Sequence, residues 1–328
     1  MSLSDTSKSG APYGFAMLYP AFVVLGLVFL LSAPFLGVYP IFLMKVLCFA
    51  VMASAFNLML GYVGLLSFGH AAFFGMGAYV LGHTLKEWGL PPMGGLALAT
   101  GVAALMGLVF GAIAIRQKGI YFAMITMALG QLVYFVCVQA PFTKGEDGIQ
   151  AIPRGTVLGV LDLRDTLTLY YFVLAIFVFG FLVIYRTVRS PLGQALKGVR
   201  ENEQRMISLG YPVAQMKVLA FTISAALTGL AGATKAIVFQ TATLTDVQWQ
   251  TSGEAVLMTL IGGIGTLFGP IVGAGIIITI QSRFASMGSW IMVIIGVIFV
   301  VCVMAFRKGV VGTLLESGKS GPSASSDT

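Results

Sequence analysis

The sequence predicts an all-α fold, a polytopic transmembrane helical bundle of about eight to ten helices. Hydrophobic residues make up 58% of the 328 positions, and charged residues make up only 9%. Apolar runs of roughly 18 or more residues recur along the chain, and each is long enough to cross a hydrocarbon core of about 30 Å as a helix. Helices are required there because lipid cannot satisfy the backbone groups of open sheets or irregular loops.

The apolar runs follow one another with mostly short connections, which indicates one transmembrane domain over residues 17–311. A polar tail precedes it at residues 1–16, and we expect the first run to stay as an anchor instead of being cleaved as a signal. The small, polar residues 312–328 are expected to be disordered. In order, the candidate spans are 17–36, 41–60, 66–85, 93–115, 119–140, 167–185, 217–239, 254–280 and 289–306.

Two of these spans are rich in glycine. The stretch "IGGIGTLFGPIVGAG" interrupts span 254–280, and because glycine and proline weaken helices we predict two short helices joined by a bend. The earlier stretch "GYVGLLSFGHAAFFGMGAY" is expected at a helix–helix interface, since small residues let helices approach closely. Because the two stretches share a similar pattern of glycine, small and apolar residues, an internal repeat is one interpretation of them. The predicted packing and bend residues are Gly61, Gly64, Gly69, Gly262, Gly263, Gly265, Gly269 and Pro270.

Four polar side chains inside the spans are candidates for the translocation path. An ionisable side chain at membrane depth, such as His70, is a functional candidate by default. The alternative is a neutral imidazole bonded to a neighbouring helix, which we favour because the spans show no acidic partner. The same choice between path lining and interhelical contact applies to Asn57, Thr126 and Gln131.

Charge in the loops predicts the orientation of the chain. The segment 186–217 carries six basic and two acidic residues, whereas the connection 141–166 carries three basic and four acidic residues. Short loops rich in lysine and arginine stay in the cytoplasm, so the first segment is predicted inside and the second outside. Both termini are predicted to be cytoplasmic. The net charge of +7 does not indicate nucleic acid, because the basic residues form no continuous face with interleaved aromatic residues.

The stretch "SPLGQALKGVRENEQRMISLGYP", residues 190–212, is too charged to cross the bilayer. Its four clustered charges would cost on the order of 10 kcal/mol at mid-membrane. Ser190 with Pro191 predicts a helix start, and Asn202 predicts the cap of a second short helix that stops at Gly210. We therefore predict a pair of short amphipathic helices in water, either covered by a partner or lying on lipid headgroups.

Four segments in this order resemble the permease subunits of branched-chain amino acid ABC importers, a group that includes urea and amide importers. They are "NLMLGYVGLLSFGHAAFFGMGAY", "GIYFAMITMALGQ", "SPLGQALKGVRENEQRMISLGYPVAQMKVLAFTISAALTGLAGA" and "LMTLIGGIGTLFGPIVGAG", spread over roughly residues 50–311. The chain is more similar to the LivM-like subunit than to its LivH-like partner. The outer segment "TKGEDGI" departs from the family, with Lys144 and Glu146 in place of small residues, so the solute stays open.

The resemblance implies a type II-like ABC importer permease in the bacterial inner membrane. Residues 186–216 would be the cytoplasmic coupling loop and 141–166 the outer loop. The implied partners are cytoplasmic ABC ATPase subunits, a second LivH-like permease subunit, an extracytoplasmic solute-binding protein and the lipid bilayer, with no nucleic acid. The residues on the family's loop motif, and hence the implied ATPase-coupling set, are Arg200, Glu201, Asn202, Glu203 and Gly210.

The sequence gives no sign of an ATP-hydrolysing site or another catalytic centre in this chain. "GTLLESGKS" has the wrong spacing for a phosphate-binding loop, so ATP hydrolysis is expected on a separate subunit. Cys48, Cys137 and Cys302 lie apart in apolar spans, and we expect no metal or cofactor. A membrane enzyme is disfavoured, because no paired carboxylates or histidine clusters appear. An ion-coupled secondary transporter stays the alternative, supported by the glycine-rich interruption.

Overall fold

The computed structural model describes residues 28–37, 39–157 and 161–285, together with isolated positions at 26, 288, 293, 296, 297, 300 and 304. The predicted tails 1–16 and 312–328 lie outside the described residues, as does nearly all of the predicted span 289–306. Within the predicted span 17–36, the structure describes residue 26 and residues 28–36, and this part ends in the 3-10 turn η1 (Ala33–Leu36).

Five helices in the described part of the chain are long and apolar enough to cross a membrane, by length and composition. They confirm the predicted spans 41–60, 93–115, 119–140, 167–185 and 217–239. These helices are α2 (Pro40–Asn57) with its π-helical continuation η2 (Leu58–Val63), α4 (Pro92–Ala114), α5 (Ile120–Gln139), α6 (Thr166–Arg189) and α9 (Val213–Phe239).

The two glycine-rich spans are shorter or divided. Span 66–85 becomes α3 (His70–Lys86), which follows a loop at residues 64–69. Span 254–280 is divided into α10 (Trp249–Gly262) and α11 (Gly269–Arg283), so the predicted pair of short helices is confirmed. The bend between them passes through Gly263 and Gly265, whose φ angles of 119° and 76° lie in the left-handed region that favours glycine.

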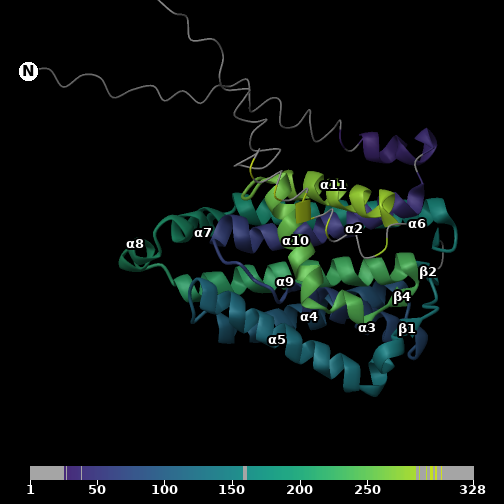
Figure 1. The fold of residues 1–328 in the computed structure, drawn as a ribbon, viewed down its shortest axis with the longest axis horizontal. Helices are drawn as coiled ribbons and strands as arrows, with labels where there is room; N and C mark the ends of the chain where they lie inside the picture. The colour runs from purple at the N-terminus through teal and green to yellow at the C-terminus, as the bar shows by residue number, and fades with distance from the viewer. Residues whose placement is uncertain are drawn as a thin grey trace, which may run out of the picture.

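Helix α9 lies at the centre of the bundle and packs against α2, α3 and α4 (Figure 1). Helix α2 packs in turn against α6, α10 and α11, so it joins the two groups of helices. Two short helices, α7 (Pro191–Glu201) and α8 (Glu203–Ser208), project at one end of the molecule, on the left in Figure 1. We call this end the module end.

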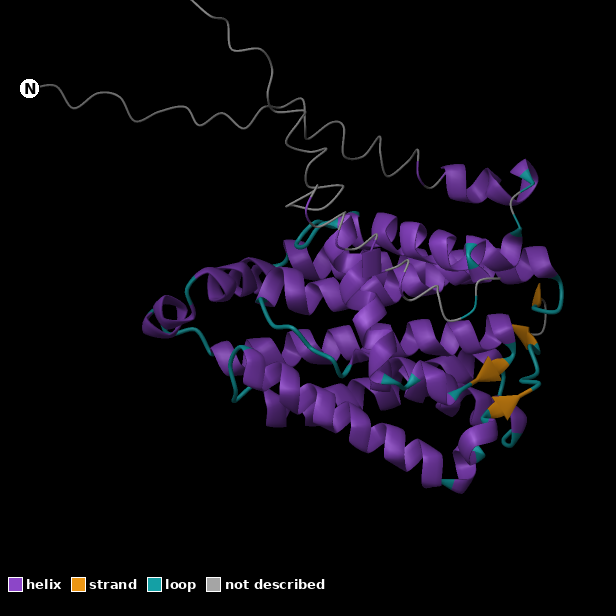
Figure 2. Ribbon diagram, in the orientation of Figure 1, coloured by secondary structure: helices purple, strands orange, loops and turns teal. Residues whose placement is uncertain are grey.

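The opposite end carries short strands between the helices (Figure 2). Strand β1 (Ile149–Gln150) pairs antiparallel with β4 (Thr241–Ala242), and β2 (Thr156–Val157) pairs with β3 (Leu161–Asp162). The 3-10 turns η3 (Pro141–Thr143), η4 (Gly145–Asp147) and η5 (Leu244–Asp246) complete these connections. Strands β1, β2 and β3 lie in the α5–α6 connection and β4 lies in the α9–α10 connection. These two-residue strands pair backbone groups of the connections, and the predicted all-α fold is confirmed.

Candidate functional site

Helices α7 and α8 form the unit that the sequence singled out, which we call the module (residues 190–212). The Ser190 side chain accepts a hydrogen bond from the backbone N–H of Gly193, and the Asn202 side chain accepts one from that of Arg205. These are helix N-caps. Gly210 has a φ of 84° directly after α8, so the chain turns there toward α9. The two predicted short helices and their boundaries are therefore confirmed.

One face of α7 belongs to the bundle core. Leu196 is fully buried and Val199 is 4% exposed, which anchors the module through apolar contact. Lys197 lies over the ring of Tyr62 in η2, with 5.7 Å between its Nζ and the ring centroid, which is within cation–π range. The module is thus seated on the end of α2.

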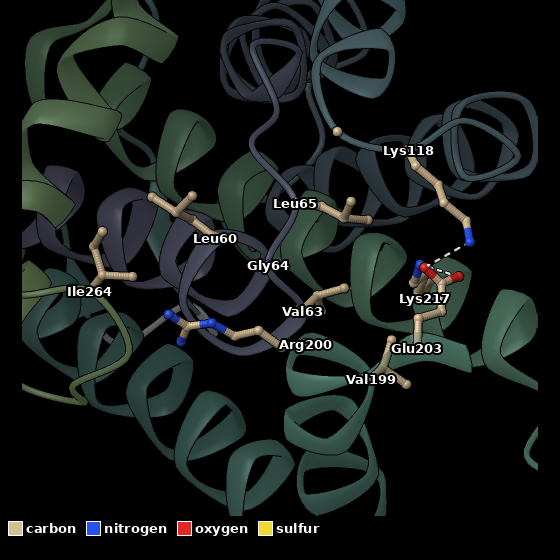
Figure 3. Close-up of a pocket in the computed structure, with 11 residues that line it drawn as sticks. Leu60, Val63, Gly64, Leu65, Lys118, Val199, Arg200, Glu203, Lys217 and Ile264 are labelled. Carbon is tan, nitrogen blue, oxygen red and sulfur yellow. Dashed lines mark hydrogen bonds and ion pairs between the residues drawn. The ribbon is translucent and has the colours of Figure 1, made fainter. Parts of the chain in front are cut away.

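Two charged side chains at the junction of α7 and α8, those of Arg200 and Glu203, contact the bundle (Figure 3). Glu203 forms ion pairs with Lys217 at 2.9 Å and with Lys118 at 3.2 Å. Burial alone would raise the pKa of the Glu203 carboxyl, but the hydrogen bonds and charges of the two lysines outweigh it, so its pKa lies below the ordinary value. The carboxylate is therefore charged at neutral pH.

Arg200 points to a different part of the bundle. Its guanidinium donates a hydrogen bond to the backbone carbonyl of Gly61 in η2 and lies beside Gly265 in the α10–α11 bend. Between Arg200 and the ion pairs of Glu203 lies a cavity of about 510 Å³. Its apolar wall comes from the end of α2, the following loop, the bend and α7, through Leu60, Val63, Leu65, Ile264 and Val199.

The five residues of the implied coupling set therefore lie in different settings. Arg200 and Glu203 contact the bundle, Asn202 caps α8, and Gly210 forms the turn. Glu201 is exposed to solvent. The sequence did not identify Lys118 and Lys217 as partners of Glu203. The three residues lie on different elements, so no helical or strand spacing relates them in the sequence.

The outward surface of the module is apolar at its tip. Ile207 is 50% exposed, Leu209 65% and Tyr211 47%. A cluster of large apolar side chains at the polar end of a helical bundle is typical of a surface that a partner covers. This tip is the part of the module that is free to meet another chain.

The four path candidates do not converge on one site. Asn57 is buried and holds the α10–α11 bend, since its Nδ2 donates to the carbonyl of Thr266 at 2.9 Å and its Oδ1 accepts from the N–H of Gly265 at 3.0 Å. Thr126 accepts from the N–H of Phe68 and donates to the carbonyl of Ala123. Gln131 is partly exposed and makes no side-chain hydrogen bond to the described residues.

His70 lies in an aromatic environment between α3 and α9. Its Nε2 is 2.8 Å from the hydroxyl of Ser224, and that hydroxyl donates to the carbonyl of Ala55 at 2.6 Å. Because the serine proton is already donated, the imidazole Nε2 must carry the proton that it shares with Ser224. The rings of Phe56, Phe73 and Phe221 surround it edge-on. This geometry favours the interpretation of His70 as a neutral contact between helices.

The glycines of the two runs lie against each other. A methyl group on Gly61 would overlap the backbone of Gly265, so the end of α2 and the bend touch through these two residues. A methyl group on Gly262 would overlap the carbonyl of Gly269, so the end of α10 and the start of α11 are in close contact at these two residues. Gly64 has a left-handed backbone conformation (φ 80°) and lies beside Arg200. Gly69 precedes α3, and Pro270 lies in the first turn of α11.

Replacing Thr266 by alanine is expected to loosen the bend. Its hydroxyl donates to the carbonyl of Gly263 at 2.8 Å and accepts from the N–H of Gly269, the first residue of α11, at 3.1 Å. Losing an intramolecular hydrogen bond typically destabilises a protein by about 0.5–1.5 kcal/mol. Thermal unfolding in detergent measures the change. The control is Thr222→Ala, because that hydroxyl bonds only to Val218 of the same helix; equal unfolding temperatures for the two variants contradict the prediction.

At the strand end, Lys144 and Glu146 lie on the surface. Lys144 has a φ of 62° and pairs with Glu87 at 3.7 Å, an exposed pair of the kind that contributes about 0–1 kcal/mol. The described residues contain no group of three or more histidine, cysteine, aspartate or glutamate side chains that could hold a metal ion.

The chain is similar in sequence to known transport proteins. A family model described as "Branched-chain amino acid transport system / permease component" matches residues 38–303. The chain is 27% identical over 284 residues to the high-affinity branched-chain amino acid transport system permease protein LivM of Salmonella typhimurium and to that of Escherichia coli. Each alignment covers 80% of this chain and 67% of the relative. No solved structure matches.

Proposed function

Because the chain belongs to the branched-chain amino acid transport permease family, we propose that it is the membrane-spanning permease subunit of an ATP-driven ABC importer. Its solutes would be branched-chain amino acids or related small polar molecules delivered by an extracytoplasmic binding protein. ATP would be hydrolysed on separate cytoplasmic ATPase subunits, and a second, LivH-like permease subunit would complete the pathway. This chain would contribute the passage and the contact to the motor.

The observation that supports the proposal best is the module with its exposed apolar tip. The module is charged, which keeps it in water, and it is held firmly to the bundle by Leu196, Val199 and the ion pairs of Glu203. A rigid projection with an apolar tip fits a groove in another protein, in the manner of a helix laid into a hydrophobic groove. We assign that groove to the ATPase subunit.

The charge distribution supports an orientation with the module in the cytoplasm of a bacterial inner membrane. Lys118 contacts Glu203, so the α4–α5 turn lies at the module end with the basic segment 186–217. Lysine and arginine favour the cytoplasmic side, which makes 186–216 the coupling loop and 141–166 the outer loop. Both termini are proposed to be cytoplasmic as well.

We test the proposal by replacing the apolar tip. Changing Ile207 and Leu209 together to aspartate places two charges at the centre of the proposed contact, where unpaired charges strongly oppose docking. The expected result is that ATPase subunits co-purify with the native chain from its host membranes in mild detergent and are lost from the I207D/L209D variant. Uptake of radiolabelled leucine by cells falls in parallel.

The matched control is Arg164→Asp, which makes the same change in net charge on an exposed residue at the strand end. It is expected to leave co-purification unchanged. Retention of ATPase by the I207D/L209D variant excludes the tip as the contact. If the native chain carries no ATPase and takes up solute in a proton gradient alone, the chain is instead an ion-coupled secondary transporter.

A further inference from the structure

Glu203 is the only acidic side chain that bridges the module to the bundle among the described residues. It lies at the first position of α8 and pairs with Lys217 near the start of α9 and with Lys118 in the α4–α5 turn. Its own side chain is only 24% exposed, so it faces the bundle and not a partner. This orientation does not suit a docking contact.

The burial of Lys217 strengthens its ion pair with Glu203. Its side chain is 4% exposed, whereas that of Lys118 is 59% exposed. A buried ammonium group needs an oppositely charged partner, because its desolvation free energy is otherwise uncompensated. Glu203 supplies that partner, so α8 and the start of α9 are held together in a way that the exposed Lys118 pair alone could not achieve.

The hydrogen bond of Arg200 to the bundle differs from these ion pairs in kind and in place. Arg200 bonds to the neutral carbonyl of Gly61 at the end of α2, and the cavity of about 510 Å³ separates that contact from the ion pairs. The module therefore contacts η2, the continuation of α2, through Arg200, Lys197 and the packing of α7. The ion pairs of Glu203 instead connect the module to α9 and to the α4–α5 turn (Figure 3). Helix α9 is the one that packs against α2, α3 and α4, so a displacement of its first turn affects most of the bundle.

We propose that Glu203 is a positioning residue that transmits movement of the docked module to α9 and to the α4–α5 turn, through Lys217 and Lys118. The inference rests on the proposed function, because it requires an ATPase seated on the module tip. It assigns Glu203 to transmission, and it leaves docking to the exposed face that carries Ile207 and Leu209. Coupling between ATP hydrolysis and transport is then the property that Glu203 controls.

The test uses the complete transporter, with its ATPase and permease partners, in liposomes with the binding protein. Glu203→Gln keeps the shape of the side chain and removes its charge. The expected result is unchanged ATPase co-purification, with leucine uptake per ATP hydrolysed reduced by roughly 2- to 30-fold, the range seen for residues on coupling networks. Glu87→Gln, the same change on an exposed glutamate at the strand end, is expected to match the native complex.

A second variant guards against misfolding of the first. Lys118→Gln removes one partner of Glu203 from an exposed position and leaves the buried pair intact, so it is expected to fold and to show a smaller loss of coupling. Loss of the ATPase from Glu203→Gln overturns the proposal in favour of a docking role. An uptake-to-hydrolysis ratio equal to that of the native complex in both variants overturns it as well. Failure of the native chain to carry any ATPase is a separate result, which refutes the proposed function itself.

Discussion

Replacing Asp246 by asparagine is expected to destabilise the protein more than any other single change considered. Asp246 lies in η5 and accepts from Nζ of Lys235 on α9 with both carboxylate oxygens, at 2.8 and 2.7 Å. The two side chains are only 9% and 13% exposed. Removing one charge of a buried pair leaves the other uncompensated, which costs about 3–5 kcal/mol. The variant should therefore unfold at a clearly lower temperature in detergent.

Asparagine isolates the charge because it preserves the local structure. The carboxylate also accepts from the N–H and hydroxyl of Thr243 in a capping box, and the amide oxygen of asparagine can replace that acceptor. The matched control is Asp162→Asn, an exposed aspartate at the same end of the molecule. If both variants unfold at the same temperature, the pair does not stabilise the fold.

A double variant separates the charge from the packing. Changing Lys235 to methionine together with Asp246 to asparagine removes both charges and keeps the volumes close to the original. Because neutral replacement of a buried pair is often tolerated, we expect this variant to recover most of the stability lost by Asp246→Asn. Recovery is measured by the same thermal unfolding, and its absence would mean that the uncompensated charge of Lys235 does not cause the loss of stability.

The membrane spans could be predicted from the sequence because hydropathy and length are local properties. The starts and ends of α7 and α8 were predictable for the same reason, since Asn202 and Gly210 act on backbone groups a few residues away. The division of the span 254–280 was also predictable, because glycine and proline change helix stability wherever they occur.

The contacts of the candidate site could not be predicted in this way. Glu203 carries the same formal charge whether it faces an ATPase or Lys217, and only tertiary packing brings α9 to it. Asn57 shows a similar limit, because a polar residue in an apolar span has the same composition signal on a transport path and at a helix contact. The sequence identified these residues as unusual, and the structure determines what each of them touches.

The last prediction concerns the closest approach between α3 and α9. Gly232 of α9 lies so near the backbone of α3 that a methyl group there would overlap the carbonyl oxygen of Phe74. Backbone cannot yield as a flexible side chain does, so Gly232→Val must push the two helices apart. Overpacking of this kind typically costs about 1–3 kcal/mol. Helix α9 also carries Ser224, the partner of His70, so the separation would disturb that contact as well.

The matched control is Gly101→Val in α4, where nothing lies within 4 Å of the added group. Valine is a better helix former than glycine, so this variant is expected to keep or slightly raise the unfolding temperature. The same substitution should therefore have opposite effects at two transmembrane glycines, a difference that propensity alone does not produce. Equal unfolding temperatures for the two variants would show that α3 and α9 do not depend on close backbone contact at Gly232.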